Sequence, residues 1–109
     1  MRAFLYCRVA HDYGSCLKGQ VTVLRDFADQ EGYTIAGVSS EQGSGMAIDR
    51  PGLQEVTQAV LSGKVDVVLV AGMSRISRAW SVTKEYIDFL TANNVQLMCL
   101  KEHITFAKK

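Results

Sequence analysis

The segment from Val65 to Val70 constrains the fold of this chain most, because nearly all of its residues are β-branched or aliphatic. An apolar run without polar alternation is typical of a strand that is covered on both faces. Such strands lie at the centre of parallel sheets. We therefore expect Val65 to Val70 to form a central parallel strand.

Strand-like and helix-like segments alternate along the rest of the chain. In the helix-like segments, apolar residues recur three and four positions apart, and Pro51 suits the first turn of a helix. This alternation predicts an α/β fold: a doubly wound open sheet, mostly parallel, with about four to five strands, right-handed crossovers and helices on both faces. The expected strands cover residues 3–9, 33–38, 65–70 and 95–100, and the expected helices cover 20–30, 51–63 and the residues around 86–90.

Polar segments follow the strands at 8–14, 39–50 and 72–78. In open α/β sheets the ligand crevice lies beyond the carboxyl ends of the strands, so these segments should converge there. They carry four arginines, and guanidinium groups bind phosphate oxygens in a bidentate way. The pattern therefore predicts a phosphate site, with ordinary surface arginines as the alternative. The four arginines are Arg8, Arg50, Arg75 and Arg78.

Composition excludes several classes of protein. The 109 residues are 48% apolar, which suits one packed domain, and a net charge of +1 does not by itself indicate nucleic acid. Three cysteines without a CxxC pair favour reduced thiols, and no secretory signal or membrane span is visible, so a cytoplasmic protein is expected. His11 and His103 lack neighbouring metal ligands, and the glycines form no nucleotide-binding motif. No metal and no cofactor is expected.

Five segments, in order, resemble the catalytic domain of serine recombinases of the resolvase/invertase family. Residues 6–10, YCRVA, are similar to the opening YxRVS, and Gln20 with Leu24 and Phe27-Ala28 resembles the helix that follows it. Residues 43–53 are similar to the GxSG…RPG segment. Residues 65–70 with 74–78 resemble VDVVLV…DRLSR. The resemblance extends from Ala3 to about Leu100 and implies a resolvase-like sheet.

The resemblance implies DNA strand exchange, in which a serine hydroxyl attacks a phosphodiester and arginines stabilise the developing charge. Arg8, Arg50, Arg75 and Arg78 match the family's arginines, and Gln20 matches its helix motif. Two positions depart from the pattern: Ala10 stands at the nucleophile position, and Ser74 at the acidic position before the paired arginines. A methyl group cannot attack phosphorus. We therefore expect a degenerate recombinase domain that retains a phosphate-binding arginine cluster.

Alternatives to this interpretation stay open. A displaced nucleophile, such as Ser15, Cys16 or Ser74, would keep the enzyme active, although in-line attack at about 3–3.5 Å rarely survives such a shift. The fold also suits a non-enzymatic protein-interaction or regulatory module. An unrelated receiver domain fits worse, because the first strand is not followed by an acidic pair.

In the family, a dimerisation helix and a DNA-binding region follow the catalytic domain. The sequence ends at Lys109, so we expect one resolvase-like domain over 1–109 without either part. The expected partners are the DNA phosphate backbone, bound weakly by this chain alone, and a homo-oligomer or a hetero-oligomer with an active recombinase. DNA recombination, integration or transposition is the implied setting, and no membrane contact is expected.

Overall fold

The computed structural model describes residues 1–9, 16–42 and 51–107. Strands and helices alternate, as expected, and one short 3-10 helix precedes the last α-helix. The elements are β1 (Arg2–Val9), α1 (Cys16–Glu31), β2 (Thr34–Gln42), α2 (Pro51–Leu61), β3 (Val67–Val70), η1 (Met73–Arg75), α3 (Trp80–Ala92), β4 (Gln96–Cys99) and β5 (Ile104–Phe106).

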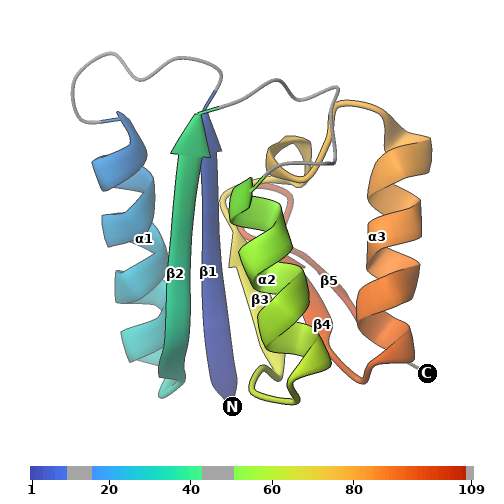
Figure 1. Cartoon of the computed structure of the whole chain (residues 1–109). Helices are drawn as coiled ribbons and strands as arrows, with labels where there is room; N and C mark the ends of the chain where they lie inside the picture. The colour runs from blue at the N-terminus through green and yellow to red at the C-terminus, as the bar shows by residue number, and fades with distance from the viewer. Residues whose placement is uncertain (10–15, 43–50, 108–109) are drawn as a thin grey trace.

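The five strands form one sheet in the order β2-β1-β3-β4-β5 (Figure 1). The first four strands are parallel, and β5 runs antiparallel to β4 at the edge. From β1 the chain moves outward to β2, returns across β1 to β3, and continues in the other direction to β4. The prediction of a doubly wound, mostly parallel open sheet is confirmed. The winding direction changes between β1 and β3, and ligand crevices form at such points.

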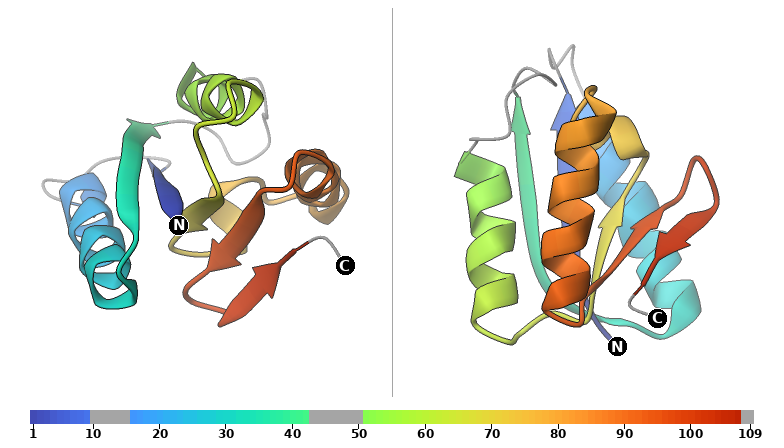
Figure 2. Two further views of the ribbon diagram at one scale, coloured as in Figure 1. Left: turned by 90° about the horizontal axis from the view of Figure 1, so that it is seen from below. Right: turned by 90° about the vertical axis from the view of Figure 1, so that its right-hand side faces the viewer.

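Helices cover both faces of the sheet, with α1 on one side and α2 and α3 on the other (Figure 2). Side chains of β1 alternate between the two sides, as the pleat of a strand requires. Leu5 and Cys7 pack with Leu24 of α1, whereas Phe4 and Tyr6 pack in the cluster of α2 and α3. The uninterrupted apolar β3 lies between these two cores, and all four of its residues are buried. Burial on both faces explains its lack of alternation.

Two boundaries differ by four residues from the sequence-based expectation, and one strand, β5, has no counterpart among the expected ranges. Helix α1 begins at Cys16, not at Gln20, because Leu17 continues the apolar face that packs against the sheet. Strand β2 runs on to Gln42, since its backbone pairs with β1 up to Val9. Strand β5 has three residues and follows a turn in which His103 has a φ of 56°. So short a strand leaves almost no periodic signal.

In the described part of the chain, no helix combines the length and the apolar character that a membrane span requires.

An ion pair between Arg2 and Asp66 lies at the amino end of the parallel strands. It predicts that acid lowers the stability of the fold. The Arg2 side chain donates to Asp66 at 3.1 Å, and this hydrogen bond is the main cause that lowers the pKa of Asp66 to about 2.

A carboxylate whose folded pKa is depressed stabilises the fold above its unfolded pKa and loses that contribution as pH falls through the folded value. Stability should therefore fall between about pH 4 and pH 2. In Asp66→Asn this fall should be smaller, as measured by urea unfolding across that window. The effect should be modest because the pair is exposed, and identical acid profiles would contradict it.

Candidate active site

Arg8 lies near the carboxyl end of β1, but its side chain is only 2% exposed. Its Nε donates to the carbonyl oxygen of Arg75 at 3.0 Å, and its Nη2 donates to that of Ser74 at 2.6 Å. Strand alternation places Arg8 on the same side of the sheet as Phe4 and Tyr6, facing the segment that follows β3. Arg8 thus fixes this segment to β1 through two charge-assisted hydrogen bonds.

We call residues 72–78, which follow β3 and include η1, the arginine loop. The loop is held from inside by Ile76, which is fully buried, and by backbone hydrogen bonds within the 3-10 turn. The side chain of Ser74 is exposed, that of Arg75 is half-buried and that of Arg78 is exposed. The loop is thus anchored by the buried Ile76 and carries two arginines whose side chains are half-buried and exposed, respectively.

Neither arginine of this loop has a carboxylate partner within the described residues. The ion pairs there join Arg2 to Asp66 and Lys84 to Asp88. Guanidinium groups without an acidic partner are available to bind an external anion.

The start of the arginine loop contacts the turn between β4 and β5. The backbone N–H of Met73 donates to Oε1 of Glu102 at 3.2 Å. A Cβ on buried Gly72 would lie 3.5 Å from Oε2 of the same carboxylate, so the backbone approaches Glu102 closely here. The loop is therefore held from two sides, by Arg8 of β1 and by Glu102.

A second carboxylate, Glu41 at the end of β2, caps helix α2. It accepts hydrogen bonds from the backbone N–H groups of Gly52 at 2.9 Å and Leu53 at 3.2 Å, and from the hydroxyl of Tyr6 at 2.6 Å. Ser39 donates to the carbonyl of Gly52 at 2.9 Å. A carboxylate at a helix N-terminus satisfies free N–H groups and interacts favourably with the helix dipole. These contacts fix the start of α2 at the same edge of the sheet.

Gln20, on the second turn of α1, connects that helix to β1. Its Nε2 donates to the carbonyl of Arg8 at 3.2 Å. Its Oε1 is buried without a hydrogen-bond partner in the described part of the chain. The hydrogen bond from Nε2 thus links α1 to the carboxyl end of β1.

Ser77 lies shortly before helix α3 but does not cap it. Helix α3 has Ala79 at its N-cap position, without a side-chain cap. The Ser77 hydroxyl accepts from the N–H of Ala79 at 3.0 Å, and its carbonyl accepts from the hydroxyl of Thr83 at 3.2 Å. Ser77 is buried, so it stabilises the turn before the helix.

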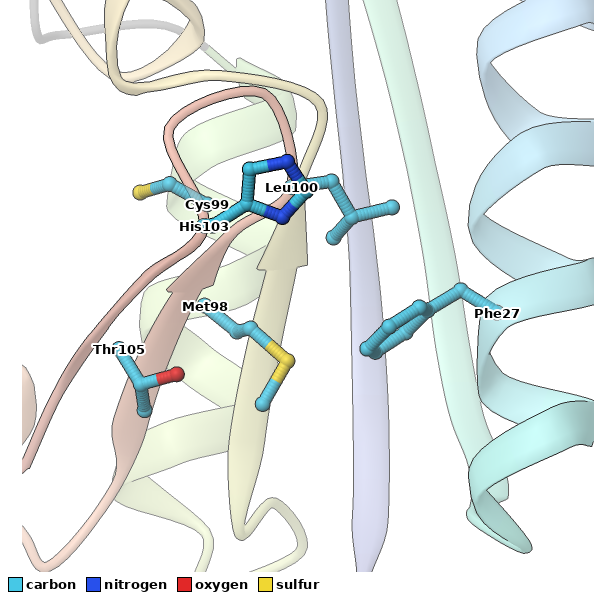
Figure 3. A pocket seen from close by; sticks show the side chains of 6 residues that line it. All are labelled: Phe27, Met98, Cys99, Leu100, His103 and Thr105. Atoms are coloured by element: carbon cyan, nitrogen blue, oxygen red, sulfur yellow. The ribbon is translucent and has the colours of Figure 1, made fainter.

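A cavity of about 370 Å³ opens on the α1 side of the sheet (Figure 3). Phe27 of α1 and Met98 of β4 point toward each other across it. Cys99 borders this cavity, but burial, with Glu102 adding in the same direction, raises the pKa of its thiol to about 12. Burial likewise raises the pKa of Cys7 to about 11, although Arg75 opposes the shift. Both groups stay protonated at neutral pH and are poor nucleophiles.

No cluster of His, Cys, Asp or Glu that could hold a metal ion occurs among the residues that the structure describes.

The chain matches the family model of the resolvase N-terminal domain over residues 3–109. It belongs to the resolvase N-terminal domain family. Solved structures of serine recombinases share its fold. The N-terminal catalytic domain of TP901-1 integrase superposes with a TM-score of 0.89 at 24% identity, covering 96% of this chain and 81% of that one.

Two further structures are more similar in sequence. The C-terminal catalytic domain of ISC1926 TnpA, an IS607-like serine recombinase, gives a TM-score of 0.86 at 27% identity, covering 92% of this chain and 67% of that one. A resolvase family site-specific recombinase from Streptococcus pneumoniae gives a TM-score of 0.83 at 28% identity, covering 96% of this chain and 75% of that one. The resolvase-like fold of this chain is thus that of serine recombinase catalytic domains.

Within this resolvase domain, the structure brings some of the predicted site residues together. Arg8 contacts the backbone of Ser74 and Arg75, and Gln20 contacts the backbone of Arg8. Arg78 lies in the same loop as Ser74 and Arg75. The predictions for Ala10 and Arg50, and that of Ser15 as a displaced nucleophile, lie outside the described residues. The side chain of Cys16 also lies outside them.

Sequence reasoning missed three residues of this resolvase site: Tyr6, Glu41 and Glu102. Glu41 was expected in a loop, and nothing in its spacing pointed to a partner. Once β2 is extended to Gln42, alternation places Ser39 and Glu41 on one face, opposite the start of α2. No local pattern identifies Glu102, because its contact with Met73 spans two connections of the fold.

Proposed function

We propose that this resolvase domain binds the phosphodiester backbone of DNA through Arg75 and Arg78 and does not itself cleave DNA. The observation that carries the proposal is the arginine loop, held at the switch point of the sheet by Arg8 and Glu102. Neither Arg75 nor Arg78 has an acidic partner among the described residues. Preorganised positive charge is what binding and stabilising a phosphodiester requires.

The proposed lack of cleavage rests on the sequence. Ala10 occupies the position of the family's nucleophilic serine, and Ser74 occupies its acidic position. Alanine has no oxygen that could form a bond to phosphorus. In this proposal, Gln20, Arg8 and Arg50 belong to the retained site. The chain would act as an accessory or regulatory subunit beside an active recombinase.

Removing both outer arginines should weaken binding to DNA. In Arg75→Ala/Arg78→Ala, we expect the affinity for a short duplex at low salt to fall at least about tenfold, as measured by fluorescence anisotropy. The slope of log K against log salt should also become less steep, by about 0.9 for each phosphate that the protein no longer neutralises. Lys84→Ala is the matched control, because it removes an exposed cation of α3 that is already paired with Asp88. Equal affinities of the double variant and the control would overturn the proposal.

The chain should form no covalent adduct with DNA, whereas Ala10→Ser should restore one when fused to a DNA-binding domain. The added hydroxyl would form an O–P bond while the bond from phosphorus to the 3′-oxygen breaks and that oxygen takes up a proton. A denaturing gel separates the phosphoserine-linked product from free DNA. An adduct of the unmodified chain would instead support a displaced nucleophile, such as Ser15 or Ser74. Failure of Ala10→Ser to react would mean that the retained arginines no longer support the chemistry.

A further inference from the structure

A hollow of about 450 Å³ lies between the arginine loop and the start of α3. This volume is within the range of about 300–1,000 Å³ that is typical of small-molecule sites. Its lining combines an aromatic side chain, Trp80, with polar side chains that include Arg78 and Ser74. The residues that line it are Met73, Ser74, Ser77, Arg78, Trp80 and Thr83.

Trp80 is exposed although its position in α3 continues the buried face of the helix. Thr83, Ile87 and Leu90, spaced three and four residues apart after it, are buried against the sheet. Trp80 itself is 55% exposed, and its ring contacts Phe106 with the centroids 6.4 Å apart. The indole is therefore accessible to a ligand that enters the hollow, whose lining includes Trp80.

Two hydrogen bonds hold the part of the lining formed by Ser77 and Thr83. Ser77 and Thr83 are buried and hydrogen-bonded to each other, and Ser77 also holds the N–H of Ala79. These bonds lie on both sides of Arg78 and fix the backbone that carries Arg78 and Trp80. A preorganised site loses less entropy when a ligand binds.

We propose that this hollow is a nucleobase subsite, in which an unstacked base of a DNA strand lies against the Trp80 indole while Arg78 holds a neighbouring phosphate. The inference rests on the proposed function, because that function supplies the phosphate contact. A nucleotide carries an anionic group and a flat π-system on one sugar, and Arg78 and Trp80 present the two complementary groups two residues apart. Stacking of bases on aromatic side chains tolerates any sequence, since every base has a π-face.

The subsite favours single-stranded or locally unpaired DNA over a matched duplex. In a duplex the bases are stacked on one another, and extruding one requires breaking its stacking and pairing. An unpaired base reaches the indole without this cost. The ligand class is therefore a DNA strand with unstacked bases next to the phosphate bound by the arginine loop.

The test compares two probes with the same number of phosphates: a short oligothymidylate and an abasic strand of equal length. Both are titrated against the full chain by anisotropy of a label on the DNA. Stacking of one base contributes at least about fivefold in affinity. We expect the oligothymidylate to bind at least fivefold more tightly, and Trp80→Leu to abolish the difference while leaving the affinity for the abasic strand unchanged. Trp80→Phe, which keeps an aromatic ring, should retain part of the preference.

Fluorescence gives a second readout, because Trp80 is the only tryptophan of the chain. At equal saturation, the oligothymidylate should quench its emission more than the abasic strand or a matched duplex does. Equal affinities and unchanged emission, with binding that still depends on Arg75 and Arg78, would overturn the subsite and leave the proposed function intact. Absence of binding to every probe would overturn both. Emission that changes with protein concentration alone would assign this surface to a second copy of the chain and would also overturn the subsite.

Discussion

Glu41→Ala should lower the free energy of unfolding by about 3 kcal/mol. The carboxylate of Glu41 accepts hydrogen bonds from the Tyr6 hydroxyl and from the N–H groups of Gly52 and Leu53. Hydrogen bonds to a charged group contribute about 1.5–3 kcal/mol each and are not additive within one network. For a domain of this size, the substitution should lower the midpoint of thermal unfolding by about 10 °C or more, as followed by circular dichroism.

Matched variants separate capping from a general loss of charge. Glu55 lies exposed on α2, and Glu55→Ala should change the stability by no more than about 0.5 kcal/mol. Glu41→Gln keeps an acceptor oxygen, so its free energy of unfolding should lie between those of Glu41→Ala and Glu55→Ala. Gly52→Ala should also destabilise the domain, because its Cβ would lie 2.6 Å from Cδ of Glu41. If Glu41→Ala unfolds at the temperature of Glu55→Ala, the carboxylate does not stabilise the start of α2.

The architecture could be predicted from the sequence because its signals are local. The continuous apolar run of β3 indicates a strand buried on both faces, and the helical spacing in α2 and α3 indicates one buried face each. Chain order then restricts the topology strongly, since parallel strands need right-handed crossovers. The edge strand β5 could not be predicted in this way, because its pairing with β4 depends on a short turn rather than on a periodic pattern.

The candidate site was only partly predictable, for a different physical reason. The sequence indicates which edge of the sheet receives the arginines, but not which atoms they contact. For Arg8, which the sequence predicts to be a phosphate ligand, the structure shows Nε and Nη2 donating to carbonyl oxygens of the arginine loop, contacts that no local pattern indicates. The pairing of Glu41 with Tyr6 joins residues 35 positions apart, and the contact of Glu102 with Met73 joins residues 29 positions apart. Such contacts follow from the register of the sheet, which no single segment specifies.

Arg8→Ala should have the second large effect, and it should act on both stability and DNA binding. The substitution removes a buried guanidinium and takes the donors away from the carbonyls of Ser74 and Arg75. Part-buried acceptors that lose these donors, together with the space left by the buried side chain, should lower the free energy of unfolding by about 3–4 kcal/mol. The arginine loop should then lose its fixed position, and the affinity for duplex DNA at low salt should fall about tenfold even though Arg75 and Arg78 remain.

Hydrogen exchange tests the cause of that effect directly. The N–H groups of Arg75 and Ile76 are bonded within the 3-10 turn, so their protection reports whether the loop stays ordered. Arg8→Lys, which cannot reproduce the fork of donors, should keep the domain folded while these two amides lose protection and DNA affinity falls with them. Arg2→Ala is the control, because it removes an arginine at the other end of β1 that is paired with Asp66. If both amides keep their protection in Arg8→Lys while DNA affinity still falls, Arg8 contacts the phosphate itself. If neither the amide protection nor the DNA affinity changes in Arg8→Lys, the two hydrogen bonds from Arg8 to the arginine loop have no role in binding, since the loop then keeps its position and its function without them.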